Sequence, residues 1–197
     1  AIRGEEIIIE QPDGSRRNIV AHPEPIFDAA GRLVGAVNML VDVTEEHRAD
    51  ETKARLAAIV ESSQDAIVSK TLDGIITSWN AGAEVIFGYT AEEAVGEHIT
   101  LIIPDERRSE EDDIIRRLRN GQRIEHYETQ RVGKGGRRVE VSVNISPLRD
   151  AHGVIIGAAK VARDITAQKR SAVELTAIKD DLAVQVEALK RLHELSL

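Results

Sequence analysis

A gapless internal repeat constrains the fold of this chain more than any other feature. When the sequence is shifted by 122 positions, residues 14–48 fall on residues 136–170 without an insertion. The coincident residues are Gly14 with Gly136, Pro25 with Pro147, Gly31 with Gly153, Gly35 with Gly157, and Asp42-Val43-Thr44 with Asp164-Ile165-Thr166. Because turn-forming residues recur at the same spacing, one structural unit occurs twice. The first copy lacks a front half, so we expect a full unit at 63–166 and a truncated one at 1–44.

The full unit combines strand patterns with helix patterns. Two β-prone runs, 65–71 and 75–79, flank the turn residues Asp73-Gly74, which favours an antiparallel hairpin. Helical patterns follow at 81–87 after the N-cap residue Asn80, at the capping box of Thr90 and Glu93, and at 109–119. Three further strands are expected at 123–132, 138–148 and 154–165. This order predicts an α+β fold, a five-stranded antiparallel sheet with short helices on one face.

Two long helices are expected to flank the full unit, at 45–62 and 167–197. The closing helix carries an apolar stripe interrupted by the polar residue Gln185; its members are Leu175, Ile178, Leu182, Leu189 and Leu192. This spacing is typical of a parallel dimeric coiled coil, although an amphipathic helix packed on its own domain would also show it. We expect a homodimer that forms through both long helices. The three strands of the first copy, at 6–11, 16–26 and 33–43, would then be ordered by packing against something else, such as a second chain.

Composition excludes several classes of function. The chain has no cysteine, which rules out disulfides, thiolate metal sites and thiol nucleophiles. A formal net charge of −8 with interspersed acids and bases argues against a nucleic-acid-binding surface. No apolar run approaches the roughly 20 residues that span a bilayer, so we expect no membrane contact by this segment and a cytoplasmic location. With no nucleophile–base pair, metal set or phosphate loop recognisable, the chain itself is not expected to be an enzyme.

The motifs of the full unit resemble the PAS family of sensory domains. The front half carries Ile76-Thr77-Ser78-Trp79-Asn80 and Ile86-Phe87-Gly88-Tyr89, and the back half carries Lys134-Gly135-Gly136 and Asp164-Ile165-Thr166. The family usually has Asp at the position of Gly135. The resemblance implies a sheet that cups a pocket, in a sensor that regulates a histidine kinase or a cyclic-nucleotide enzyme. The effector domain would lie elsewhere in the same polypeptide, and the first residue, Ala1, fits a piece of a longer protein.

The resemblance also bears on what the pocket could hold. The flavin–cysteine adduct of photoreceptor relatives would need a cysteine at the position of Ile99, and the haem ligand of oxygen-sensing relatives matches Glu111, so adduct and haem are both disfavoured. Non-covalent flavin or a small organic ligand stays an alternative to an empty pocket. Candidate pocket residues are Trp79, Asn80, Ile86, Ile115, Leu118, Ile124, His126 and Val141. His126 shares strand parity with Ile124 and is expected to point inward, although a lone strand histidine is more often structural or exposed than a ligand.

Two further expectations concern charged and capping residues. The acidic residues at 110–113, beside several arginines, are expected to form a solvated helix face rather than a metal site. Thr166 is expected to cap the closing helix, with Arg163 or Arg170 as partner of Asp164. We hypothesise that Asp164-Ile165-Thr166 is a signal-relay joint that fixes the exit helix to the sheet, and that Asp42 and Thr44 do the same in the first copy.

Overall fold

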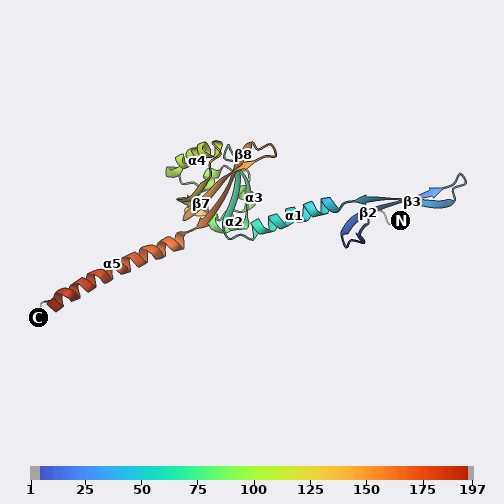
Figure 1. Ribbon diagram of the computed structural model, residues 1–197. Helices are drawn as coiled ribbons and strands as arrows, with labels where there is room; N and C mark the ends of the chain where they lie inside the picture. The colour runs from blue at the N-terminus through green and yellow to red at the C-terminus, as the bar shows by residue number, and fades with distance from the viewer. Residues whose placement is uncertain (1–4, 195–197) are drawn as a thin grey trace. The chain divides into compact units, whose positions relative to one another are not determined.

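The computed structural model describes residues 5–194, with side chains described as far as 183 and at 185 and 186. The chain divides into two compact units, one ending at Ile59 and one beginning at Val60 (Figure 1). The boundary falls within α1 (Thr44–Glu61), the predicted linker helix.

The first unit is a three-stranded antiparallel sheet of order β1-β2-β3. Its strands are β1 (Glu6–Glu10), β2 (Arg16–Phe27) and β3 (Leu33–Asp42), close to the predicted ranges. Every residue of β1 and β3 is exposed, including Ile8, Val37 and Met39. This unit therefore buries little of its own apolar surface. A small sheet usually needs one covered face to be stable alone, and this one has none within the described unit.

The second unit contains a five-stranded antiparallel sheet of order β5-β4-β8-β7-β6, which confirms the predicted α+β fold. The strands are β4 (Ala66–Thr71), β5 (Ile76–Trp79), β6 (Ile124–Val132), β7 (Arg138–Arg149) and β8 (Ile155–Asp164). The helices between β5 and β6 are α2 (Ala81–Phe87), α3 (Ala91–Ala94) and α4 (Ser109–Arg119), with short 3₁₀ turns at Ile99–Ile102 and Asp105–Arg107. They lie against one face of the sheet, and α5 (Thr166–Glu194) leaves its end (Figure 1).

Local capping signals account for the short helices. The Asn80 side chain accepts a hydrogen bond from the N–H of Ala83 at the start of α2, and Thr90 and Glu93 form the predicted capping box. Asn80 is also buried, and its side chain accepts a hydrogen bond from the N–H of Ile67 and donates one to the carbonyl of Val60. It therefore holds the start of β4 as well as the start of α2.

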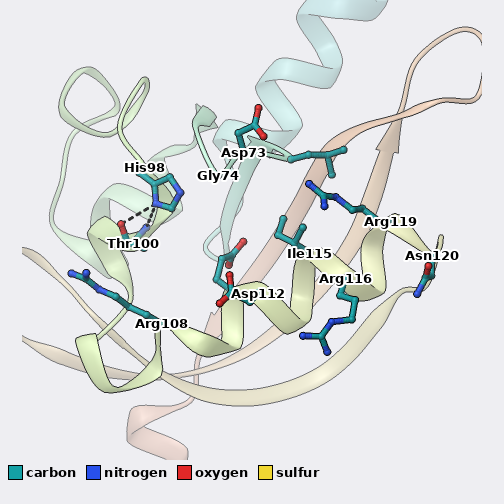
Figure 2. Close-up of a pocket in the computed structure, with 12 residues that line it drawn as sticks. Asp73, Gly74, His98, Thr100, Arg108, Asp112, Ile115, Arg116, Arg119 and Asn120 are labelled. Carbon is teal, nitrogen blue, oxygen red and sulfur yellow. Dashed lines mark hydrogen bonds between the residues drawn. The ribbon is translucent and has the colours of Figure 1, made fainter.

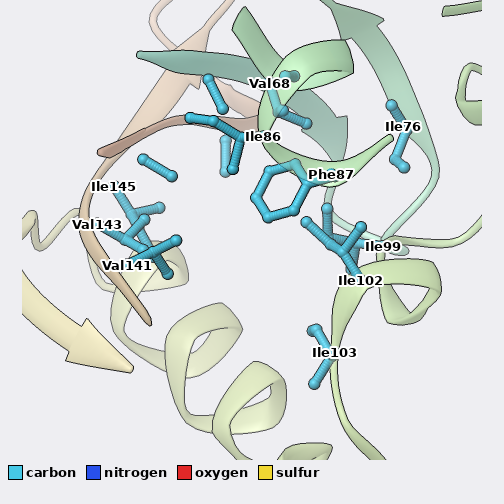
Figure 3. Packing of buried hydrophobic residues seen from close by; sticks show 14 of the residues in the cluster. Val68, Ile76, Ile86, Phe87, Ile99, Ile102, Ile103, Val141, Val143 and Ile145 are labelled. Atoms are coloured by element: carbon cyan, nitrogen blue, oxygen red, sulfur yellow. The ribbon is translucent and has the colours of Figure 1, made fainter. Parts of the chain in front are cut away.

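The core lies between the sheet and these helices (Figure 3). Phe87 of α2 points into a ring of aliphatic side chains that includes Val143 and Ile145 of β7. The alternating residues of β7 behave as predicted: Val139, Val141, Val143 and Ile145 are all buried. Trp79 packs against Phe87 with 5.5 Å between ring centroids.

The space around two equivalent glycines, Gly157 and Gly35, differs because only one of them has a neighbouring strand. A Cβ added to Gly157 in β8 would lie 2.2 Å from the carbonyl oxygen of Lys70, because β4 pairs alongside. A Cβ added to Gly35, the matching residue of β3, would meet nothing within 4 Å. Within the described residues, the first unit therefore has the back half of the repeat without the strand that the second unit places there.

A β-bulge in β6 corrects one sequence expectation. The register with β7 shifts between Ile124 and Tyr127, and His126 adopts a positive φ of 50°. The bulge breaks the two-residue alternation, so Ile124 is buried while His126 is exposed. The expectation that His126 points inward is therefore wrong.

Candidate functional site

A buried ion-pair cluster lies between α4 and the sheet of the second unit. Glu111 of α4 is 6% exposed and lies 2.6 Å from the Nζ of Lys70 in β4 and 2.8 Å from the Nζ of Lys160 in β8. The two lysines are 1% and 8% exposed. One carboxylate thus joins the helix layer to two neighbouring strands.

Burial and charge act against each other in this cluster. Burial lowers the pKa of Lys160 to about 8, since it outweighs the attraction of Glu111, and the charge of Lys70 lowers it further. Burial alone would raise the pKa of Glu111, but Lys160 and Lys70 keep the pKa below its usual value. Glu111 is therefore ionised at neutral pH, with two cations beside it.

The preceding residue, Glu110, anchors a second network. Its carboxylate lies 2.9 Å from the Nη1 of Arg131, which is 5% exposed, and 2.6 Å from the Nη1 of Arg107. Thr129 donates a hydrogen bond to the same carboxylate at 2.9 Å. The expectation of a solvated acidic face is therefore wrong for Glu110 and Glu111, although Asp112 and Asp113 are exposed.

The interior of this unit encloses a cavity of about 20 Å³, enough for roughly one water molecule. Two cations and eight apolar residues line it: Arg131 and Lys160, with Ala66, Val68, Phe87, Ile99, Ile102, Val143, Ile145 and Ala162. Ligand pockets usually measure about 300–1,000 Å³. This volume is far below that of haem or flavin, and Glu111, at the position matched to a haem ligand, is engaged by two lysines.

A larger groove of about 660 Å³ lies outside, between α4, the turn at Asp73 and Gly74, and the loop of His98 and Thr100 (Figure 2). Arg108, Arg116 and Arg119 line it together with Asp73, Glu111 and Asp112, so its charges balance. Glu111 lines this groove and also bonds Lys160, which lines the inner cavity. A single carboxylate therefore lies between the two spaces.

The joint between the last strand and the exit helix has the same hydrogen bonds in both units. The N–H of Glu140 donates to Thr166 Oγ1 (3.0 Å), and the N–H of Thr166 donates to the Asp164 carboxylate (2.8 Å). In the first unit, the N–H of Asn18 donates to Thr44 Oγ1 (2.8 Å), and that of Thr44 donates to Asp42 (3.0 Å). Thr166 thus ties its helix to β7, and Thr44 ties its helix to the equivalent strand β2, rather than capping the helix as expected.

The aspartates of the two joints differ in their charged partners. The hydrogen bonds of Thr44, followed by that of Arg17, lower the pKa of Asp42 to about 2. Arg163, an expected partner of Asp164, instead pairs with Asp65 through two hydrogen bonds of 3.0 and 2.9 Å, which corrects that expectation. Since Asp65 precedes β4 and Arg163 lies near the end of β8, this pair joins the two ends of the unit.

The family model described as the PAS fold matches residues 54–165, more than half of the chain. The chain belongs to the PAS family. The histidine-protein kinase AtoS of Escherichia coli is 27% identical over 166 residues, 84% of this chain and 26% of the kinase. Sensor protein FixL of Bradyrhizobium diazoefficiens is 29% identical over 98 residues, 48% of this chain and 19% of FixL. A PAS-domain crystal structure from Colwellia psychrerythraea, 26% identical, superposes with a TM-score of 0.55 over 59% of this chain and 98% of that domain.

The chain thus spans about a fifth to a quarter of the length of these curated relatives. The PAS unit is homologous to the sensory regions of sensor histidine kinases, which supports a sensory role rather than a catalytic one. No helix in the described part of the chain has a stretch apolar and long enough to cross a bilayer. Nor do the described residues group three or more histidine or acidic side chains as a metal site would need.

The candidate pocket residues fall into two groups in the PAS unit. Trp79, Asn80, Ile86, Leu118, Ile124 and Val141 are buried, whereas Ile115 is half-buried at the outer groove and His126 is exposed. None of these eight residues lines the inner cavity. The residues that sequence reasoning missed are Lys70, Glu111, Arg131 and Lys160. Strand parity could have found Lys160, because it lies on the same face of β8 as the buried residues Ala158 and Ala162.

The stripe predicted for α5 is exposed as far as the side chains are described. Leu175, Ile178 and Leu182 are all exposed, while Leu189 and Leu192 lie outside the described side chains. The helix does not bury Leu175, Ile178 or Leu182 against its own PAS unit, so packing on that unit does not account for this part of the stripe.

Proposed function

We propose that this chain is a signal-relay segment of a larger, cytoplasmic sensor protein. In this proposal the truncated unit (1–44), the linker (45–62), the full PAS unit (63–166) and the exit helix (167–197) act in series. The output would be an effector of the histidine-kinase type elsewhere in the polypeptide, as the relation to AtoS supports. The observation that carries the proposal is the joint, whose hydrogen bonds recur in both units.

The joint offers a physical route for a signal. Because Thr166 bonds the N–H of Glu140, a movement of β7 shifts the first turn of α5 directly. The Arg163–Asp65 pair links that end of the sheet to the residue before β4. A change in the sheet can therefore bias the exit helix between two arrangements, which requires only a differential interaction energy.

Replacing both Asp164 and Thr166 by Ala should leave the PAS unit folded but uncouple it from the output. The N–H of Glu140 would lose its acceptor, so its hydrogen exchange should accelerate at least tenfold while the protection of the central strands persists. In the full-length protein, autophosphorylation should no longer respond to the signal. Thr176→Ala is the matched control, because the Thr176 hydroxyl donates to the carbonyl of Ala172 within its own helix and has no other hydrogen-bond partner in the described part of the chain. Normal regulation in the double variant would refute the relay.

The same proposal assigns the α5 stripe to a second copy of this chain in a parallel coiled coil, with α1 contributing. Burial of a Leu or Ile side chain stabilises by about 1.5–3 kcal/mol, so a few such pairs decide the oligomeric state. Ile178→Asp should convert the dimer into a monomer in light-scattering measurements at micromolar concentration. Ala177→Asp adds the same charge outside the stripe and should leave the dimer intact. A wild-type chain that is monomeric at all concentrations would contradict this part of the proposal.

A ligand-sensing role is the second candidate, and the buried charges around the inner cavity favour it. The absorption spectrum of the protein purified from cells tests the cofactor alternatives directly, because haem and flavin both absorb visible light. The inner cavity, at about 20 Å³, would have to expand for any organic ligand, and the required expansion is smallest for a small one.

A further inference from the structure

The interior of the PAS unit holds more positive than negative charge. Lys70, Arg131 and Lys160 are buried, and among the described residues only Glu110 and Glu111 pair with them as carboxylates. Arg107 adds a fourth, half-exposed cation to Glu110. An uncompensated buried charge is costly, so this site is more favourable with one further anion than without it.

The internal repeat places other residues at the equivalent positions of the first unit, where they are exposed. β1 pairs with β2 in the register in which β6 pairs with β7, since Ile9 faces Arg17 and Arg131 faces Val139. The first unit therefore has Ile9 at the position of Arg131 and Asn38 at that of Lys160. Since apolar residues often stabilise as well as a buried ion pair does, the cations of the second unit suggest a purpose other than stability.

Two of the three guanidinium nitrogens of Arg131 are available to a ligand. Its hydrogen bonds to Glu110, Thr129 and the carbonyl of Gln130 all come from Nη1. Within the described part of the chain, Nε and Nη2 make no hydrogen bond. A guanidinium edge with two parallel N–H groups matches the two oxygens of a carboxylate. The other residues that line the cavity, apart from Lys160, are apolar and would suit a short hydrocarbon chain.

We propose that this interior binds a short-chain organic monocarboxylate, with its carboxylate between Arg131 and Lys160 and its chain among Phe87, Ile99 and Val143. The inference rests on the proposed sensory function and names the class of ligand. The cavity of about 20 Å³ must expand to admit such a molecule. Glu111, between the outer groove and the cavity, is the group that moves, and its displacement carries the binding event to α4 and the sheet.

Thermal unfolding of the 197-residue chain with sodium acetate, propionate and butyrate tests the proposal. At a hundredfold excess over Kd, the midpoint of the PAS unit should rise by on the order of 10 °C. Sodium chloride and sodium nitrate at equal concentration, and the neutral analogue butyramide, should give no comparable shift. Methyl NMR signals of Ile99, Ile102 and Val143 should move with the same concentration dependence, which places the ligand inside.

Two variants test the cations: Arg131→Ile and Lys160→Asn, which introduce the residues found at the equivalent positions 9 and 38 of the first unit. Each removes one cation of a buried pair and should therefore lower the stability of the PAS unit, because a carboxylate loses its partner. Circular dichroism establishes that each variant is folded before ligand is added, and each should weaken butyrate binding at least tenfold. Arg55→Gln removes an exposed arginine of α1 and should bind as the wild type does. An equal response to nitrate or butyramide, a shift without movement of the interior methyl signals, or undiminished binding by both variants would overturn the proposal. The hydrogen-exchange measurement on the joint and the dimer experiment use no ligand, so failure here leaves the relay proposal standing.

Discussion

Glu111→Gln should lower the stability of the PAS unit by about 3–5 kcal/mol. The substitution keeps the shape of the side chain but leaves Lys70 and Lys160 buried without their carboxylate. Trp79 is the only tryptophan and is buried in this unit, so its fluorescence in urea follows this unfolding selectively. Asp112→Asn, the adjacent exposed carboxylate, should change stability by less than about 0.5 kcal/mol.

The loss should depend on pH in a defined direction. An unfolded lysine holds its proton up to about pH 10, whereas burial already lowers the pKa of Lys160 to about 8, and without the Glu111 carboxylate the folded variant would release this proton still earlier. The unfolded state then binds more protons, so the stability of Glu111→Gln should rise with pH between the two pKa values. Replacing all three residues by apolar ones, as Lys70→Met, Glu111→Leu and Lys160→Met, should restore most of the stability. A single variant as stable as the wild type would show that the cluster is neutral to folding.

Gly157→Ala should destabilise the PAS unit by about 3 kcal/mol. The new Cβ would lie 2.2 Å from the carbonyl oxygen of Lys70, and two paired backbones cannot separate without breaking the β4–β8 ladder. Trp79 fluorescence in urea measures the loss.

Gly35→Ala is the matched control, because the equivalent Cβ meets nothing within 4 Å. Hydrogen exchange in β2 and β3 should change by an amount equivalent to less than about 0.5 kcal/mol. Equal damage at both positions would mean that backbone conformation, rather than the neighbouring strand, requires glycine.

Regular features of the sequence predicted most of the fold. The Asp73-Gly74 turn, the caps of α2 and α3 and the alternation of β7 are local signals, and each element lies within two residues of its predicted range. The repeat added a long-range constraint, because it predicted that both units would end in the same joint.

The interior charges could not be predicted in the same way. An acidic run beside arginines is usually solvated, and only the packing of α4 on β4 and β8 decides that Glu111 turns inward. The bulge at His126 likewise depends on how β6 meets β7, where the Asn144 side chain accepts the N–H of His126. In both cases the deciding contact joins residues far apart in the chain.

The shared joint also bears on how such proteins gain and lose sensors. A chain lacking residues 45–166 would connect Thr44 to Ala167, as Thr166 is connected now. The threonine would still accept a backbone N–H from a middle strand, and the aspartate two residues earlier would still accept the N–H of the threonine. Recombination between the copies can thus delete or duplicate a whole module while the attachment of every output helix keeps its chemistry.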